Sequence, residues 1–182
     1  MQTQADQTVE IKARCRDPEA IRAAILAAGA QAQGYVTQMD TFYNVPQGRL
    51  KLRRGGKESL LIGYLRPDQP GPKHCLVDLY PCRDADSLDK VLSGTLGVKA
   101  VVKKERSVFL LGDRVKFHLD RVESLGDFVE IEVLGVRDKD TVEELKETCE
   151  KYLDLLGISG KDLVERAYVD LLLDLEPDNN SA

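Results

Sequence analysis

The sequence is poor in the features that mark several common classes of protein. It has no tryptophan, and aromatic residues make up only 5% of the chain, which argues against a stacking surface for single-stranded nucleic acid. Acidic residues outnumber basic ones by 31 to 26, for a formal net charge of −5, so bulk charge does not favour nucleic acid either. No apolar run approaches the length of a membrane span. We therefore expect neither a nucleic-acid nor a membrane partner.

Cysteine is scarce and scattered. The four cysteines, at positions 15, 75, 82 and 149, form no CxxC pair, which argues against a zinc ribbon or a thioredoxin-like site. Free thiols are typical of a reducing compartment. Residues 1–8 are polar and lack the apolar core of a signal peptide. We expect a cytoplasmic protein.

The 182 residues suit one domain with a proper core. Asp17-Pro18 is typical of a helix start, as is Asp140 before an amphipathic stripe that ends at Gly157. Alternation and turn residues predict strands over 9–15, 38–43, 49–53, 59–65, 74–80, 100–111, 114–120 and 128–134, and helices over 18–28, 84–97, 141–156 and 162–175. These elements indicate an α+β fold with a strongly curved or closed antiparallel sheet.

Several of the predicted strands alternate charged with apolar residues. Glu10–Arg14, Arg49–Arg53 and Glu130–Val133 each place their charges on one face, because successive side chains of a strand point to opposite sides. An open sheet with one face in water explains any single run. Arg-x-Lys-x-Arg, however, sets like charges side by side, which is unfavourable unless an anion or carboxylates neutralise them. A bound polyphosphate would relieve that repulsion.

Carboxylates form the complementary half of the pattern. Glu10, Asp120, Glu130 and Glu132 offer the hard oxygen ligands that Mg²⁺ or Mn²⁺ prefers. A metal that bridges carboxylates and phosphate oxygens is the usual arrangement for phosphoryl transfer. The alternative interpretation is that these acids only form salt bridges with nearby lysines and arginines.

The order of short motifs along the chain resembles the CYTH family, also called triphosphate tunnel metalloenzymes, in its class IV adenylyl cyclase-like branch. The family's ExExK strand corresponds to Thr8–Lys12, and the other matching segments are Asp40–Tyr43, Gly48–Arg53, Tyr64–Asp68, Gly71–Lys73, His118–Glu123, Leu125–Glu132 and Ala167–Leu172. The resemblance implies an eight-stranded antiparallel barrel that forms a tunnel, with helices packed outside. It covers nearly the whole chain, so we expect residues 1–176 to form a single CYTH domain and residues 177–182 a disordered tail.

The resemblance also implies roles for individual residues. Glu10, Lys12 and Glu132 would be catalytic, and Glu10, Asp120, Glu130 and Glu132 would bind one or two ions of Mg²⁺ or Mn²⁺. The triphosphate would be held by Lys12, Arg49, Lys51, Arg53, Arg66, Lys73, Lys104, Arg106 and Lys116. His118 could act in proton transfer.

One departure from the family pattern bears on function. Thr8 stands where the first Glu of ExExK belongs, so the site lacks one negative charge and a second metal is in question. We expect a metal-dependent enzyme that hydrolyses a nucleoside, thiamine or inorganic triphosphate. The alternatives are a class IV adenylyl cyclase, which converts ATP to cyclic AMP and pyrophosphate, and a non-catalytic triphosphate or polyphosphate binder. A monomer and a homodimer are both compatible with the sequence.

Overall fold

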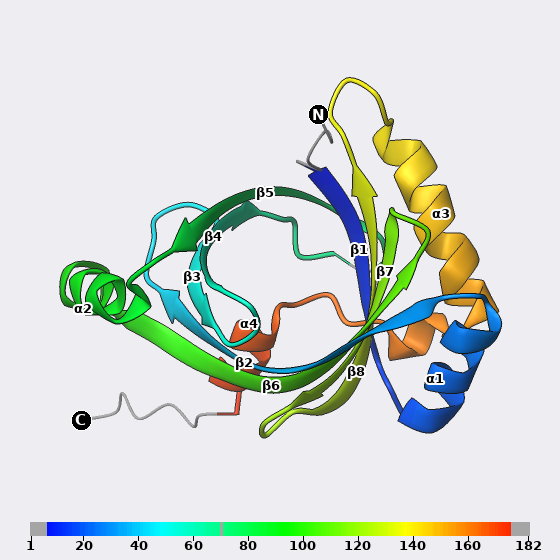
Figure 1. Ribbon diagram of the computed structural model, residues 1–182, viewed down its shortest axis with the longest axis horizontal. Helices are drawn as coiled ribbons and strands as arrows, with labels where there is room; N and C mark the ends of the chain where they lie inside the picture. The colour runs from blue at the N-terminus through cyan, green and yellow to red at the C-terminus, as the bar shows by residue number, and fades with distance from the viewer. Residues whose placement is uncertain (1–6, 70, 176–182) are drawn as a thin grey trace.

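A computed structural model describes residues 7–69 and 71–175. In this part of the chain, eight antiparallel strands close into a barrel in the order β1-β5-β4-β3-β2-β6-β7-β8 (Figure 1). The strands are β1 (Gln7–Arg14), β2 (Gln31–Tyr43), β3 (Arg49–Arg54), β4 (Ser59–Leu65), β5 (Lys73–Cys82), β6 (Val98–Leu111), β7 (Val115–Val122) and β8 (Gly126–Gly135). The predicted α+β fold and antiparallel barrel are confirmed.

Two helices cover one side of the barrel. These are α1 (Pro18–Ala27) and α3 (Val142–Leu155), and Figure 1 shows both on the side opposite α2 (Ala85–Leu96). Beneath them lies the main apolar core, which contains the outward residues of the predicted charged strands, such as Val9 and Ile131, both fully buried. Burying these apolar faces under helices leaves the charged faces of the same strands directed into the barrel.

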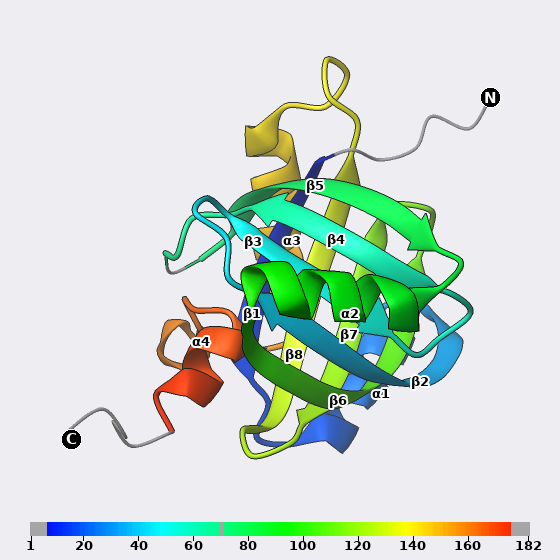
Figure 2. The same ribbon diagram turned by 90° about the vertical axis from the view of Figure 1, so that its left-hand side faces the viewer.

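Helix α2 packs more loosely. It crosses the outside of β2 and β3, and Figure 2 views the barrel from this side. None of its residues is buried. Among the described helices, none has both the length and the apolar character needed to cross a membrane.

The cap of α3 differs from the prediction. Thr141, not Asp140, is the N-cap, and it forms a capping box with Glu144. Asp140 instead accepts a hydrogen bond from the backbone N–H of Val136 at 2.8 Å. The threonine has the Glu three residues ahead that a capping box needs, and it frees Asp140 to close the preceding turn.

Strand β2 begins at Gln31 rather than at the predicted residue 38. Its first half carries mostly exposed side chains and so lacks the alternation that marks a half-buried strand. It is extended because it pairs with β6 from Gln31 to Tyr43, through a register shift at Gly34, where φ is +133°. The hydrogen-bonding partner, rather than the hydrophobic pattern, sets the length of this strand.

The C-terminal helix is shorter than predicted. A short 3₁₀ helix, η1 (Gly160–Asp162), comes first, and α4 covers only Tyr168–Leu173. Between them the backbone is tied to β1, because Leu163 bridges Ala13 and the Val164 N–H donates to the Lys12 carbonyl at 2.8 Å. This segment brings α4 to one end of the barrel (Figures 1 and 2).

Apolar residues of the C-terminal segment pack on the barrel itself. Leu163 is partly buried against the main core, and Leu171 and Leu172 against a second core cluster that includes Phe42. Leu175 is exposed. The predicted tail, 177–182, lies outside the described residues.

Candidate functional site

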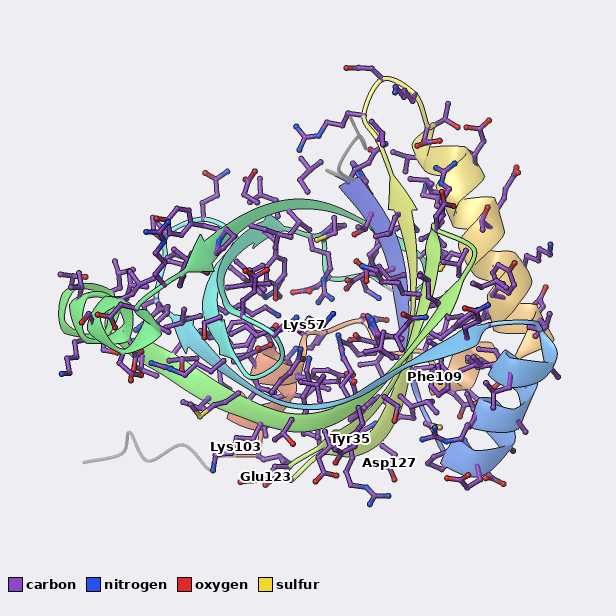
Figure 3. All side chains as sticks on the ribbon, viewed as in Figure 1. Tyr35, Lys57, Lys103, Phe109, Glu123 and Asp127 are labelled. Carbon is purple, nitrogen blue, oxygen red and sulfur yellow. The ribbon has the colours of Figure 1, made fainter. Side chains whose placement is uncertain are left out.

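The inner faces of the strands line a cavity of about 510 Å³. Side chains project into the ring from all around it, whereas the labelled Lys103, Glu123 and Asp127 lie outside (Figure 3). Ten of the thirteen predicted site residues are in the cavity wall: Glu10, Lys12, Lys51, Arg53, Arg66, Lys104, Arg106, Lys116, Glu130 and Glu132. The alternation of side chains along the strands, read from the sequence, therefore brings together residues of five strands and Arg66, which directly follows β4.

The other three predicted residues do not line this cavity. Arg49 donates to Asp68 at 2.6 Å and to Asp170 at 2.8 Å, beside a smaller cavity of about 120 Å³. The ammonium of Lys73 is buried and donates to the backbone carbonyls of Gly71 and Val164. Asp120 lies behind Arg106, which it binds through two hydrogen bonds of 2.6 and 2.5 Å.

One buried carboxylate of the cavity was not among the predicted site residues. It lies between Lys51, Arg53 and Lys104, which form the cationic wall of the cavity. Asp40 of β2 accepts from Arg53 twice, at 2.7 Å each, and from Lys51 at 3.1 Å, and Lys104 lies 3.8 Å away. Burial opposes its ionisation, but Lys51 and Arg53 outweigh that effect and hold the pKa of Asp40 well below its usual range. The signal was present, because Gln38, Asp40 and Phe42 alternate with the outward residues of β2.

The cations around Asp40 are crowded. Burial, reinforced by the neighbouring Arg53, lowers the pKa of Lys51 to about 8. Burial and Arg106 lower the pKa of Lys104 to about 7. An anion bound beside these lysines would raise the pKa of each and so favour their charged forms.

Carboxylates gather on the opposite part of the wall, along β1 and β8. Glu10 lies directly across from Glu132 in the strand register, and Lys12 lies across from Glu130. Glu10 accepts from Arg66 at 2.5 Å, and Glu130 accepts from Lys12 and, at 2.5 Å, from Arg106.

Two of these carboxylates, Glu10 and Glu130, have lowered pKa values despite their burial. Burial raises the pKa of Glu10, but Arg66 and Lys12 together outweigh that effect, so the net pKa of Glu10 is lowered. Burial likewise opposes ionisation of Glu130, yet Lys12 and Arg106 hold its pKa well below normal. Glu132 is the least engaged of the three, and one of its oxygens lies 3.9 Å from the ammonium of Lys116.

Three buried polar atoms of the described residues have no hydrogen-bond partner, and all belong to the cavity wall. They are Gln38 Oε1, Arg66 Nε and His118 Nδ1. His118 Nδ1 lies 3.6 Å from Glu130 Oε2, and burial and Arg106 lower the pKa of His118, which favours the neutral ring. Native proteins rarely leave buried polar atoms unpaired, so these three require a polar partner in the cavity, either water or a ligand.

The donor chemistry of the carboxylate wall fits a hard divalent cation. Glu10, Glu130 and Glu132 project from adjacent strands into the same cavity, and oxygen ligands suit Mg²⁺ and Mn²⁺. Within the described residues, however, no three His, Cys, Asp or Glu side chains are gathered as a metal-binding group. Glu10 and Glu130 are instead each paired with a cation.

Comparison with known proteins identifies the family. The sequence profile of the CYTH domain matches residues 6–168. The chain belongs to the CYTH domain family. This confirms the family predicted from the motifs, and no curated protein sequence matches the chain significantly.

Solved CYTH-like structures share the fold. The PH1012 protein from Pyrococcus horikoshii OT3 superposes with a TM-score of 0.79 and 26% identity, over 90% of this chain and 98% of that one. A candidate adenylate cyclase from Vibrio parahaemolyticus gives 0.76 and 20%, over 93% and 99%. HpAC1 from Hippeastrum, a candidate adenylyl cyclase with a dominant triphosphatase activity, gives 0.63 and 16%, over 94% and 98%.

Proposed function

We propose that this CYTH domain binds a triphosphate in the barrel and hydrolyses it with a divalent metal. The observation that carries the proposal is the charge of the cavity. Seven lysine and arginine side chains line it against four carboxylates, a formal excess of three positive charges inside a chain whose formal net charge is −5. Such a local excess fits a compact polyanion.

The cations divide the work of holding the phosphates. Lys51, Arg53 and Lys104 surround Asp40, and Arg106 continues the same wall, so fork-like and point charges face the cavity together. Lys12, Arg66 and Lys116 face it from the neighbouring strands. We assign the remaining predicted phosphate ligands, Arg49 and Lys73, to the end of the barrel next to the C-terminal segment.

Glu10, Glu130 and Glu132 would hold Mg²⁺ or Mn²⁺, and Asp120 would support them through Arg106. The metal would supply charge neutralisation and orientation for the phosphates and the nucleophile. Lys12 sits beside Glu130 and would stabilise charge on the transferred phosphoryl group. His118, whose Nδ1 has no hydrogen-bond partner, would in its neutral form accept a proton from the attacking water.

An apolar part of the wall supports a substrate with an organic group. Leu60 and Ile62 of β4 and Val77 and Leu79 of β5 line the cavity. In the strand register, Ile62 pairs with Leu79 on one side and with Lys51 on the other, so the apolar wall adjoins the phosphate wall. A nucleoside or thiamine triphosphate would cover this surface, whereas inorganic tripolyphosphate would leave it in water.

Two alternative functions, ATP cyclisation and non-catalytic binding, also have support. Cyclisation of ATP uses the same phosphate wall with the ribose 3′-hydroxyl as nucleophile, and the likeness to the Vibrio candidate adenylate cyclase supports it. The dominant triphosphatase activity of HpAC1 supports hydrolysis. Thr8, which lines the cavity beside Glu10 without adding a carboxylate, supports a non-catalytic binder. A cytoplasmic location and the choice between monomer and homodimer stay predictions.

One assay separates these functions. The protein is incubated with tripolyphosphate, ATP and thiamine triphosphate in Mg²⁺ or Mn²⁺, and the products are identified. We expect inorganic phosphate. Formation of cyclic AMP and pyrophosphate would show that the protein is a cyclase rather than a hydrolase. Tight binding without turnover would show a non-catalytic triphosphate-binding protein. A chain that binds none of the three compounds would rule out a triphosphate site.

A further inference from the structure

Tyr168, the first residue of α4, brings an aromatic ring into the charged wall of the cavity. The residue is only 6% exposed and lines the cavity. The ammonium of Lys12 lies 3.6 Å from the centre of its ring, and that of Lys104 lies 5.4 Å away. Its hydroxyl donates to Asp120 Oδ2 at 3.0 Å. One side chain from the C-terminal segment thus contacts charged groups of β1, β6 and β7.

The same segment also holds the backbone of Lys12. The Val164 N–H donates to the Lys12 carbonyl at 2.8 Å, and the Val164 carbonyl accepts from Lys73 Nζ at 3.1 Å. The ring of Tyr168 is itself fixed, because it packs edge-on against Phe128 with ring centres 4.9 Å apart. The C-terminal segment therefore contacts Lys12 at both ends: Val164 binds its main chain, and Tyr168 contacts its ammonium.

An aromatic face suits this task for a physical reason. It attracts an ammonium group without using any of the three N–H donors in a directional hydrogen bond. Lys12 gives one donor to Glu130, and the ring compensates part of the lost hydration of the buried charge. The remaining donors stay available to a phosphate in the cavity. A leucine at this position would fill space but offer the ammonium no comparable attraction.

We propose that Tyr168 is a positioning residue that holds the Lys12 ammonium at the cavity wall, ready to contact the triphosphate. This inference rests on the proposed function of the cavity. The competing interpretation is that Tyr168 is only a core aromatic that closes one end of the barrel. Both interpretations predict the same position and packing for Tyr168. Only the positioning role predicts that its ring affects Lys12, so the experiment must measure a property of Lys12.

The experiment compares Tyr168→Leu, Tyr168→Phe and, as a matched control, Phe117→Leu. Phe117 is a fully buried aromatic packed edge-on against Tyr152, and it does not line the cavity. Three properties are measured in the full chain: the proton NMR shifts of the Lys12 side-chain methylenes, the Kd for tripolyphosphate, and the kcat and KM for its turnover with Mg²⁺ or Mn²⁺.

We expect the Lys12 methylene protons to be shifted upfield by the ring in the wild type and in Tyr168→Phe, but not in Tyr168→Leu. Turnover should fall about 10- to 100-fold in Tyr168→Leu, mainly in kcat, because misplacing a reacting group by a small distance has effects of this order. In a chain that binds without turnover, the loss appears as a weaker Kd. Phenylalanine should restore most of the function, and Phe117→Leu should lose thermal stability but keep kcat.

The outcomes distinguish this inference from the proposed function. If Tyr168→Leu keeps the wild-type Kd and kcat, the positioning role is wrong while the triphosphate site stands. If the wild type shows no upfield shift at Lys12, the contact itself is absent and the inference falls. If the wild type neither binds nor turns over a triphosphate, the proposed function fails, and the role of Tyr168 fails with it.

Discussion

At the scale of single residues, Asp40 shows how one buried charge can organise a binding wall. Its carboxylate is 2% exposed and lies within ion-pair distance of three cations from two other strands. Without that carboxylate, Lys51, Arg53 and Lys104 would repel one another inside the barrel. A bound triphosphate would meet the same need from the other side, so Asp40 and the ligand act on the same charges.

Replacing Asp40 therefore has a ligand-dependent effect. We expect Asp40→Asn to lower the free energy of unfolding by about 3 kcal/mol, because breaking a buried ion pair leaves uncompensated charges. Saturating tripolyphosphate should recover part of that loss beyond its effect on the wild type. Chemical denaturation with and without tripolyphosphate measures both terms, with Asp78→Asn on the exposed part of β5 as control. An equal loss in the two variants would contradict the role of Asp40.

The depressed pKa of Lys51, about 8, predicts a coupling between protons and ligand. Its ammonium faces Asp40 on β2, Arg53 on its own strand, Arg106 on β6 and the ring of Tyr64 on β4. A triphosphate should raise this pKa, so binding near pH 8 takes up protons, and affinity falls as pH rises from 7 to 9. Calorimetry at pH 8 in buffers of different ionisation enthalpy measures the uptake. Proton release, or no exchange, would contradict the prediction.

The lowered pKa of Lys51 also determines how its contribution to the free energy of unfolding changes with pH. The folded-state pKa of Lys51 lies below its ordinary unfolded value of about 10.4. Between these values the unfolded chain binds more protons than the folded chain, so the contribution of Lys51 to stability rises with pH across that window. In the absence of ligand, Lys51→Met should flatten this part of the pH dependence of unfolding.

At the scale of elements, the register between β1 and β8 would decide where the proposed metal binds. Glu10 and Glu132 face each other across the two strands, and Glu132 carries the fewest competing contacts. We expect Glu132→Gln to weaken metal activation of turnover roughly 10- to 100-fold, as loss of groups around a metal typically does. Glu123→Gln, which changes an exposed carboxylate that pairs with Lys103 outside the barrel, is the matched control. Titration of activity with Mg²⁺ and Mn²⁺ measures the effect, and an unchanged metal dependence removes Glu132 from the site.

Elements were predictable where one physical signal was enough. Alternation located β1, β3 and β8, and it placed Lys51 and Arg53 together with Glu130 and Glu132. It could not find the exposed first half of β2, which is extended because β6 pairs with it. Nor could alternation show that Arg49 and Lys73 lie outside the cavity, since both occupy inward-facing positions of their strands. At the end of the barrel Arg49 instead binds Asp170, and Lys73 binds backbone carbonyls.

At the scale of the whole molecule, barrel closure turns a set of ordinary amphipathic strands into a charged cavity. Helices α1 and α3 cover the apolar faces, which leaves the charged faces to meet inside. The chain as a whole is acidic, but the cavity is cationic. Composition alone could not reveal this contrast, because it depends on which residues the closed sheet turns inward.

The most direct measurement is calorimetric binding of tripolyphosphate to the wild type and to Arg53→Ala. We expect one site per chain, and an affinity about 10- to 100-fold weaker in Arg53→Ala, since a hydrogen bond to a charged group contributes about 1.5–3 kcal/mol. Arg121→Ala, which removes an exposed arginine paired with Asp127 outside the cavity, should bind as the wild type does. No binding by the wild type, or equal affinity in Arg53→Ala, would contradict a triphosphate site inside the barrel.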